Sequence, residues 1–302
     1  MQRTGSYFPN AHFDTDKMAA LAAAGHDIIG FDTIMPYFSV HLEAAALGCA
    51  IDWGNVDEIP GVTDYPLKDP GEFRMPANFL DRKPIKSFLN AIGTLKETYG
   101  SEVAIVGKVI GPWTLAYHLY GVANLLMDVV IAPDKVRELL HSLKQVPLVF
   151  AQAQIAAGVD MITWADHVTS DLISPKAYED FLLPIHQECS SALQGVPTIL
   201  HVCGNVLDRI HLFADAGFTV FHLDSRNSIP KAMQIVGEKM LLTGNINNPG
   251  ALLNGDTEDV RAEVLGIIRD GLKLISPECA IPTRVPNRNL VQIVETAQSL
   301  RP

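Results

Sequence analysis

The feature that most constrains this 302-residue chain is a repeated alternation of short apolar runs with longer segments of helical pattern. The runs are apolar on both faces and rich in Val, Ile and Leu, which is typical of buried parallel strands. The alternation predicts either a doubly wound sheet or a (β/α)8 barrel. The seven predicted strands are residues 27–32, 103–110, 159–164, 197–202, 218–223, 240–245 and 272–276.

Helical segments separate these runs. Residues 15–25 precede the first run, residues 174–194 begin with a Ser-Pro pair that suits a helix N-terminus, and residues 257–271 begin with a capping signature and end on glycine. Barrels of this class use about 250 residues or more as one domain. We therefore predict one domain over residues 1–302, with a TIM (β/α)8-type barrel as its fold.

The strand count predicts a departure from a closed barrel, which needs eight strands. Only a helix precedes the first predicted strand, so the missing strand is expected to be the first and to lie upstream of Met1. The alternative is an open seven-stranded barrel whose gap is filled by the N-terminal segment or a partner. Residues 51–84 are aperiodic and rich in Pro and Gly, which predicts a long excursion over the barrel mouth.

Composition excludes several classes of protein. Hydrophobic residues make up 48% of the chain, which excludes disorder, and a formal charge of −11 disfavours nucleic-acid binding. Neither a signal peptide nor an uninterrupted apolar stretch of about 18 residues is visible, so no membrane span is expected. Four scattered cysteines do not form a disulfide framework. These features predict a cytoplasmic protein.

The most informative motif is the segment TILHVCGN, where His201 and Cys203 lie two residues apart at the end of a predicted strand. Side chains two apart on a strand share a face, and active sites lie at the carboxyl ends of barrel strands. Cys279 follows the last predicted strand, 76 residues after Cys203, which is too far for a zinc finger but suits a site assembled at a barrel rim. These three ligands would leave one zinc position open, as in catalytic sites.

The plainer interpretation is that His-x-Cys arose by chance and that the cysteines are small buried hydrophobes. We expect that role for Cys49 and Cys189. Among the carboxylates, Asp160 opens a strand and is expected to be structural, whereas Asp166 and Asp224 close strands. Asp224 is the preferred fourth zinc ligand, with orientation of His201 as its alternative role.

The segments TILHVCGN, SPECAIPTRVP, WADHVTSDLISP, GPWTLAYHL and LTGNINNP resemble the uroporphyrinogen decarboxylase superfamily, and within it the methylcobamide:coenzyme M methyltransferase branch. The resemblance implies that His201, Cys203 and Cys279 bind a catalytic zinc ion. It also implies that a small thiol takes a methyl group from a methylated corrinoid. The chain lacks the Asp-x-His-x-x-Gly pattern of cobamide carriers, so the methylcobamide is expected to arrive on a separate corrinoid protein, with residues 51–84 as one docking surface.

The methyl acceptor stays open at this point. Coenzyme M carries a sulfonate, for which Arg284 and Asn205 are candidate ligands, and Asp166 is a further candidate for substrate binding. Homocysteine and tetrahydrofolate are alternative acceptors. A decarboxylase of tetrapyrrole-like substrates is an alternative function, although residues 1–9 (MQRTGSYFP) carry Ser6 where the decarboxylase pattern has arginine. A third interpretation is a barrel that binds a corrinoid protein or a thiol without turnover. A homodimer is expected only because homodimers are common.

Overall fold

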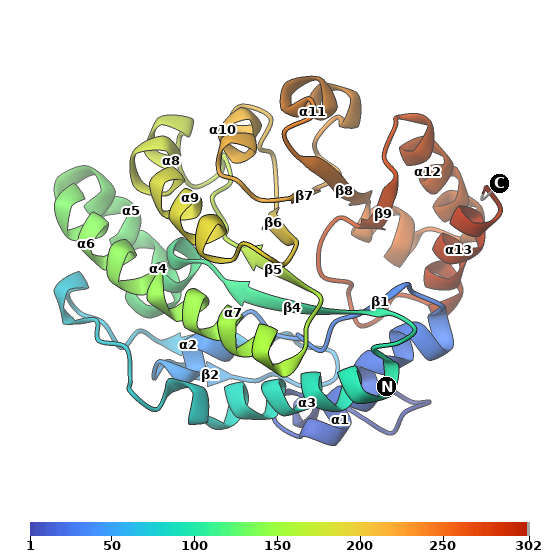
Figure 1. Cartoon of the computed structure of the whole chain (residues 1–302), viewed down its shortest axis with the longest axis horizontal. Helices are drawn as coiled ribbons and strands as arrows, with labels where there is room; N and C mark the ends of the chain where they lie inside the picture. Colours follow the sequence, from blue (N-terminus) through green and yellow to red (C-terminus); the bar gives the residue numbers. More distant parts are fainter. Residues whose placement is uncertain (301–302) are drawn as a thin grey trace.

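The structure is a computed structural model that describes residues 1–300. Its centre is a curled parallel sheet of seven strands, with helices arranged around the outside (Figure 1). Every hydrogen-bonded neighbour pair in this sheet is parallel. In spatial order the strands are β1 (Thr33–Ile34), β4 (Ala104–Ile110), β5 (Met161–Ala165), β6 (Thr198–Val202), β7 (Val220–Leu223), β8 (Leu241–Ile246) and β9 (Leu274–Pro277).

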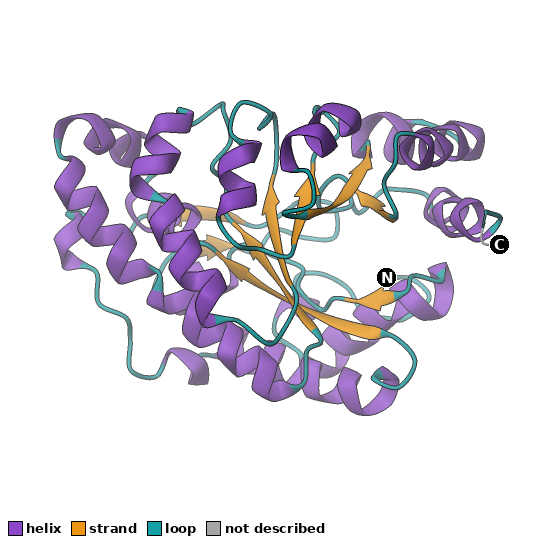
Figure 2. Ribbon diagram, turned by 45° about the horizontal axis from the view of Figure 1, so that its top comes forward, coloured by secondary structure: helices purple, strands orange, loops and turns teal. Residues whose placement is uncertain are grey.

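Helices link the strands and enclose the sheet, as Figure 2 shows. The α-helices are α1 (Thr15–Ala24), α2 (Leu42–Ala46), α3 (Lys83–Tyr99), α4 (Pro112–Tyr120), α5 (Val122–Ile131), α6 (Pro133–Leu143), α7 (Gln145–Ala157), α8 (Pro175–Phe181), α9 (Leu183–Ala192), α10 (Ile210–Asp215), α11 (Ile229–Val236), α12 (Thr257–Arg269) and α13 (Asn287–Gln298). Shorter 3-10 or π turns are η1 (Asn10–His12), η2 (Gly25–Ile29), η3 (Pro70–Glu72), η4 (Phe79–Asp81) and η5 (Asn248–Asn254).

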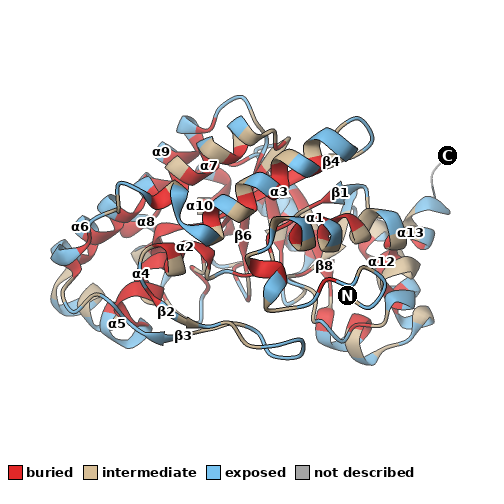
Figure 3. Cartoon of the chain, turned by 90° about the horizontal axis from the view of Figure 1, so that it is seen from below, coloured by how far each residue is buried: buried red, intermediate tan, exposed pale blue. Residues whose placement is uncertain are grey.

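The two faces of the sheet differ in chemistry. The outer face packs on the helices: Trp164 lies edge-on to His186 of α9, with ring centroids 6.1 Å apart, and both are fully buried. Figure 3 shows buried residues concentrated where helices meet the sheet. The inner face carries polar side chains near the strand ends, among them Thr163, His201 and His222. The hydrophobic core therefore lies outside the sheet, and polar groups are left inside the barrel.

The expectation of seven strands in a TIM-type barrel is confirmed. Among the described residues, β1 pairs only with β4 and β9 only with β8, so the sheet is open between β1 and β9. Helix α13 contacts η2 on this side, where a Cβ at Gly30 would lie 3.4 Å from the Val294 side chain. A helix contact thus bridges the side of the barrel at which the sheet is open.

The first predicted strand, residues 27–32, is wrong. The chain instead continues α1 into η2, and Gly30 ends that turn with φ of 93° while its N–H donates to the carbonyls of Gly25 and His26. Glycine adopts this left-handed conformation without a Cβ penalty, so it terminates a helix readily. The apolar pair Ile28 and Ile29 therefore belongs to a helical turn, and the strand begins later, at Thr33.

The predicted helix over residues 174–194 is present but broken. Ser174 caps α8 by accepting a hydrogen bond from the Ala177 N–H, as its sequence position predicts. The interruption at Leu182 precedes Pro184, which has no N–H to donate to the carbonyl four residues earlier and whose ring clashes with that carbonyl in a continuous helix. The segment therefore forms two helices, α8 and α9. By contrast, α12 is capped at its N-terminus as predicted, although the cap is Asp256, one residue before the predicted start at Thr257, in a capping box with Asp259.

The excursion at residues 51–84 contains an antiparallel ribbon of β2 (Ala50–Asp52) and β3 (Gly61–Asp64), followed by η3 and η4. An ion pair of 3.1 Å joins Asp57 in this segment to Arg284 beyond β9. The excursion thus reaches the side of the barrel where strands end. Among residues 1–300, no single helix is long and apolar enough to cross a membrane; α4 and α5 meet those criteria only as a pair, which is bent by 110°.

Candidate metal centre

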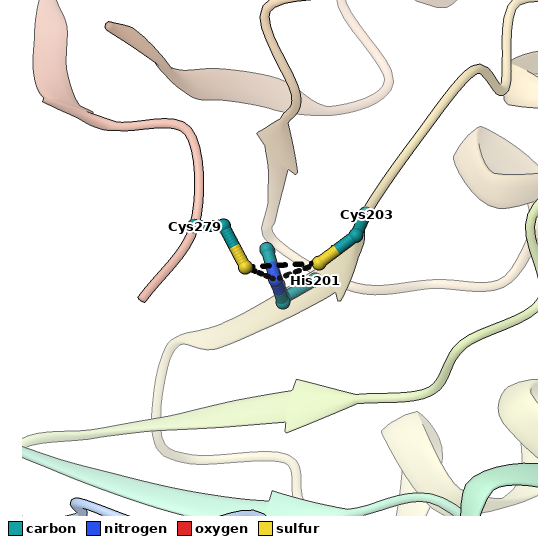
Figure 4. A group of neighbouring side chains, drawn as sticks. All are labelled: His201, Cys203 and Cys279. Carbon is teal, nitrogen blue, oxygen red and sulfur yellow. Dashed lines mark hydrogen bonds between the residues drawn. The ribbon is translucent and has the colours of Figure 1, made fainter. Parts of the chain in front are cut away.

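Three potential metal ligands converge at the carboxyl ends of β6 and β9 (Figure 4). His201 lies on β6, Cys203 follows that strand directly, and Cys279 follows β9. The His201 Nε2 lies 3.1 Å from the Cys203 Sγ and 3.6 Å from the Cys279 Sγ, and the two sulfurs are 3.0 Å apart. The three side chains thus point to one spot, as the sequence predicts.

The loop that carries Cys203 is held by a carboxylate. The N–H of Gly204 donates to the Asp224 Oδ2 at 2.7 Å, and Gly204 has φ of 85°. A Cβ at this glycine would lie 2.6 Å from the Thr169 Oγ1, so only glycine fits here without displacement. The turn after β6 therefore directs the Cys203 sulfur toward His201.

The loop that carries Cys279 is held in the same way by its neighbour, Glu278. This buried carboxylate accepts hydrogen bonds from the N–H of Asn248 at 2.8 Å and the N–H of Ser225 at 3.1 Å. Both donors lie in loops that follow other strands of the sheet, β8 and β7. Glu278 therefore ties three loops together beside the metal-ligand cluster.

Two buried asparagines complete this network. Asn227 donates to the carbonyls of Gly204 and Asp224 and accepts a hydrogen bond from the Val206 N–H. Asn245 also donates to the Asp224 carbonyl and adopts φ of 86°, a conformation that asparagine tolerates better than most residues. The strand ends from β6 to β9 thus form one connected polar layer.

The protonation of the two cysteines is coupled. The pKa of Cys279 is lowered because its sulfur accepts a hydrogen bond from Cys203 and interacts with His201. The pKa of Cys203 is raised by that same hydrogen bond and by burial. One proton shared between two sulfurs is the state expected for a dithiol site before it binds a cation, since metal binding displaces such protons.

The donor set fits a zinc ion. One imidazole nitrogen and two thiolates are ligands that zinc prefers, and three protein ligands leave a fourth position for a substrate atom. Tetrahedral zinc with Zn–S bonds of about 2.3 Å requires sulfurs about 3.8 Å apart. The present 3.0 Å separation therefore has to widen when zinc binds. The Nδ1 of His201 is buried without a partner among residues 1–300, and its ring stacks near His222 with centroids 4.5 Å apart.

The two carboxylates that the sequence predicts at the site lie outside the three-residue cluster. Asp224 accepts hydrogen bonds from Gly204 and Arg226 through separate oxygens, which places it behind Cys203. Asp166 is fully buried: one oxygen accepts from the N–H and hydroxyl of Thr114, and the other hydrogen bonds with His186 at 3.1 Å. Asp166 thus caps α4, and neither carboxylate is part of the three-residue group.

The structure also shows the surroundings of the remaining residues that the sequence analysis named. Arg284 is exposed and paired with Asp57, and the carbonyl of Asn205 accepts hydrogen bonds from the Ser170 N–H and the Thr169 hydroxyl. Cys49 and Cys189 are buried and free, outside the group, as expected. The prediction that Asp160 is structural is confirmed, because its carboxylate pairs with Lys96 at 2.7 Å and accepts a hydrogen bond from the Ile105 N–H.

A pocket of about 400 Å³ lies beside the centre, on the side of β4 and β5. His167 interacts electrostatically with His201 and Cys279, although burial is the main cause of its lowered pKa. The His118 Nδ1 is buried without a partner among the described residues, and burial lowers the pKa of that imidazole to about 3. The lining is aromatic and imidazole-rich: His41, Val62, Tyr65, Tyr117, His118, Val122, His167 and Leu172.

Several residues of the site were not found by sequence reasoning. Glu278 adjoins Cys279 and lies inside the quoted motif SPECAIP, so proximity was an available signal. His222 occupies the position on β7 that pairs with His201, which becomes evident only from the strand register. Lys108 lies on the inner face of β4, yet its surrounding sequence VAIVGKVI reads simply as a buried strand.

Comparisons with known proteins agree with this architecture. The family model Uroporphyrinogen decarboxylase (URO-D) matches residues 1–300. The chain is 32% identical over its whole length to the methylcobamide:CoM methyltransferase MtbA of Methanosarcina mazei, of which it covers 89%. It is 25% identical to a uroporphyrinogen decarboxylase of Trichodesmium erythraeum, over 79% of this chain and 68% of that protein.

A solved structure, a methyltransferase from Methanosarcina mazei, superposes with a TM-score of 0.96 at 30% identity, over 99% of this chain and 89% of the other. The resemblance predicted from the motifs is thereby confirmed. On the match to residues 1–300 and these full-length similarities, the chain belongs to the uroporphyrinogen decarboxylase family.

Proposed function

We propose that this chain is a zinc-dependent methyltransferase that moves a methyl group from a methylated corrinoid to a small thiol such as coenzyme M. The observation that carries the proposal is the convergence of His201, Cys203 and Cys279 at the strand ends. The names of the relatives support it, since MtbA of Methanosarcina mazei is described as a methylcobamide:CoM methyltransferase. Cytoplasmic localisation and homodimer formation stay predictions from the sequence.

In this proposal His201, Cys203 and Cys279 hold the zinc ion, and Asp224 and Glu278 fix the loops of the two cysteines. A bound zinc ion would supply Lewis acidity that lowers the pKa of a substrate thiol from about 8.5. The substrate sulfur forms a bond to the methyl carbon as the cobalt–carbon bond breaks. The electron pair of the broken cobalt–carbon bond remains on cobalt. The proton of the thiol is released to solvent.

The contribution of the protein to the transfer is to position the acceptor thiol. The pocket lies between the excursion and the loop after β5, because Val62 and Tyr65 line it together with His167, which interacts electrostatically with His201 and Cys279. A methylated corrinoid on a separate protein would reach the substrate sulfur through this side. The exposed apolar side chain of Ile59, at the tip of the excursion, supports a role of this segment in docking that partner.

The test is a methyl-transfer assay with free methylcobalamin and a panel of acceptors, following the loss of methyl–cobalt absorbance. Coenzyme M, homocysteine and tetrahydrofolate distinguish the acceptors, and product analysis with uroporphyrinogen tests the decarboxylase alternative. The proposal predicts zinc-dependent transfer to a thiol. Turnover of uroporphyrinogen, or a lack of transfer by the zinc-loaded protein to every thiol, would contradict it.

A further inference from the structure

Lys108 occupies the inner face of the barrel below the metal centre. It pairs with Thr163 of β5, and His201 pairs with Ala165, two residues further along the same strand. Because side chains two apart on a strand share a face, Lys108 and His201 lie on the same face of the sheet. The opposite face carries Trp164, which packs on α9. Lys108 is therefore an interior lysine one layer below His201.

The ammonium group of Lys108 has no hydrogen bond or ion pair with any residue that the structure describes between 1 and 300. Its nearest aromatic contact is the Tyr37 ring, whose centroid lies 5.5 Å from Nζ. Glu43 is close enough to act on it electrostatically but is otherwise engaged, since its oxygens accept from the Tyr37 hydroxyl and the Ile110 N–H. Burial also raises the pKa of Glu43 to about 7, so its carboxyl is only partly ionised at neutral pH.

An interior ammonium without a partner is unfavourable, because it has three donors and has lost part of its hydration. Burial lowers the pKa of Lys108, and the negative charges of Cys279 and Cys203 oppose that shift, so the ammonium lies within electrostatic range of the metal-ligand cluster. Lys108 has intermediate exposure, so solvent reaches part of its side chain. An anionic ligand that enters from the centre would supply the missing acceptor.

The other candidate cation has a different environment. Arg284 is 71% exposed, and its guanidinium already pairs with Asp57 of the excursion. A ligand would have to displace that carboxylate in water, where an ion pair contributes little. Lys108 is inside the barrel and has no competing anion within ion-pair distance among the described residues, so its interaction with an acid group would be the stronger of the two.

We propose that Lys108 binds the acid group of the thiol substrate and thereby makes the site selective for thiols that carry a sulfonate or carboxylate a few atoms from sulfur. The inference rests on the proposed function, since the substrate sulfur is placed at His201, Cys203 and Cys279. It adds the residue that recognises the acid group of the acceptor.

The experiment measures binding of three thiols to the zinc-loaded full chain by calorimetry. The thiols are 2-mercaptoethanesulfonate, 3-mercaptopropionate and 2-mercaptoethanol, and the visible spectrum of the cobalt(II)-substituted protein reports sulfur coordination without turnover. We expect the wild type to prefer one or both acidic thiols over mercaptoethanol by about 10- to 100-fold. Lys108→Met abolishes this preference at unchanged metal content, and Lys108→Arg retains part of it.

The matched control is Arg284→Met, which removes the exposed cation and should keep the wild-type preference. Equal wild-type affinity for acidic and neutral thiols overturns the inference, as does a Lys108→Met variant that weakens all three thiols alike, because that result indicates a general charge effect on the centre. Neither result affects the proposed function. A zinc-loaded wild type that binds no thiol contradicts the proposed function itself, and the inference falls with it.

Discussion

The two halves of the sheet differ in which loops and which free groups they present at the strand ends. In the half formed by β6 to β9, buried Asp224 and Glu278 accept backbone N–H groups and fix the loops of Cys203 and Cys279. In the half formed by β1, β4 and β5, His118 keeps an unpartnered ring nitrogen beside a pocket. Metal ligands require fixed distances, whereas a recognition surface requires groups that are free to bond. We infer that the first half holds the metal and the second receives its ligands.

The largest effect should come from removing a metal ligand. Cys279→Ser replaces a thiolate by a hydroxyl that zinc binds weakly, so the metal content should fall from about one ion per chain to a trace. Methyl transfer should be lost with it. The measurement is zinc analysis of the purified variant by mass spectrometry. Cys49→Ser is the control, because Cys49 is buried outside the group and should leave zinc unchanged; equal zinc in both variants would break the comparison.

A smaller effect is expected from loosening the loop of Cys203. Asp224→Asn keeps the shape of the side chain but presents an amide where the Gly204 N–H needs an acceptor. Zinc affinity should weaken by about 10- to 100-fold, as measured by competition with a chelator.

The contrasting variant is Asp166→Asn, which disturbs the buried network of Thr114 and His186 instead. It should lower the free energy of unfolding by about 1–3 kcal/mol while zinc affinity stays at the wild-type value. A loss of zinc affinity in Asp166→Asn as large as that in Asp224→Asn would show that the two halves are not separable.

His118 in the pocket half should make the stability of the protein depend on pH. Burial lowers the pKa of His118 to about 3, so the folded protein resists protonating a group that the unfolded chain protonates near pH 6.5. The unfolded state then binds more protons, and stability falls as the pH drops below 6.5. His118→Phe removes this contribution and should gain about 2 kcal/mol relative to wild type on going from pH 7.5 to pH 5. Urea denaturation at both pH values measures it; a constant difference would contradict the assignment.

The smallest effect on the isolated chain is expected at the tip of the excursion. Ile59 is 87% exposed, so Ile59→Asp should change the free energy of unfolding by no more than about 0.5 kcal/mol. Transfer from free methylcobalamin should be unchanged, whereas transfer from a methylated corrinoid protein should slow several-fold. Steady-state rates with both donors test this; equal slowing with both would place the effect in the barrel and not in docking.

The part of the fold that the sequence predicts well is the part governed by local pattern. Strands β4 to β9 follow apolar runs, and the caps at Ser174 and Asp256 depend on a few adjacent residues. Strand β1 escaped prediction because it has two residues and because Gly30 turned the preceding apolar run into a helix end. Local pattern cannot decide between these outcomes, since the same residues suit a strand and a final helical turn.

The residues of the site also fall into those that local sequence pattern predicts and those that it does not. His201 lies on β6 and Cys203 follows that strand directly, so their two-residue spacing predicts that they act together. The link from Glu278 to Ser225 and the position of Lys108 below His201 depend on strand register, which joins residues far apart in the chain. Carboxylates at strand ends were expected near the metal, but Asp224 and Asp166 are used to hold backbone N–H groups. The residue type of Asp224 and Asp166 indicated polar groups at the barrel rim, but it did not indicate which groups these carboxylates bind.

The central claim is that a substrate thiol binds to a metal held by His201, Cys203 and Cys279. Zinc K-edge X-ray absorption of the loaded protein, with and without a thiol, tests it most directly. The donor set predicts one nitrogen and two sulfur ligands from the protein, and a third sulfur when 2-mercaptoethanesulfonate is added. A sulfur count that does not change on addition of the thiol, or a first shell without two protein sulfurs, would contradict the account.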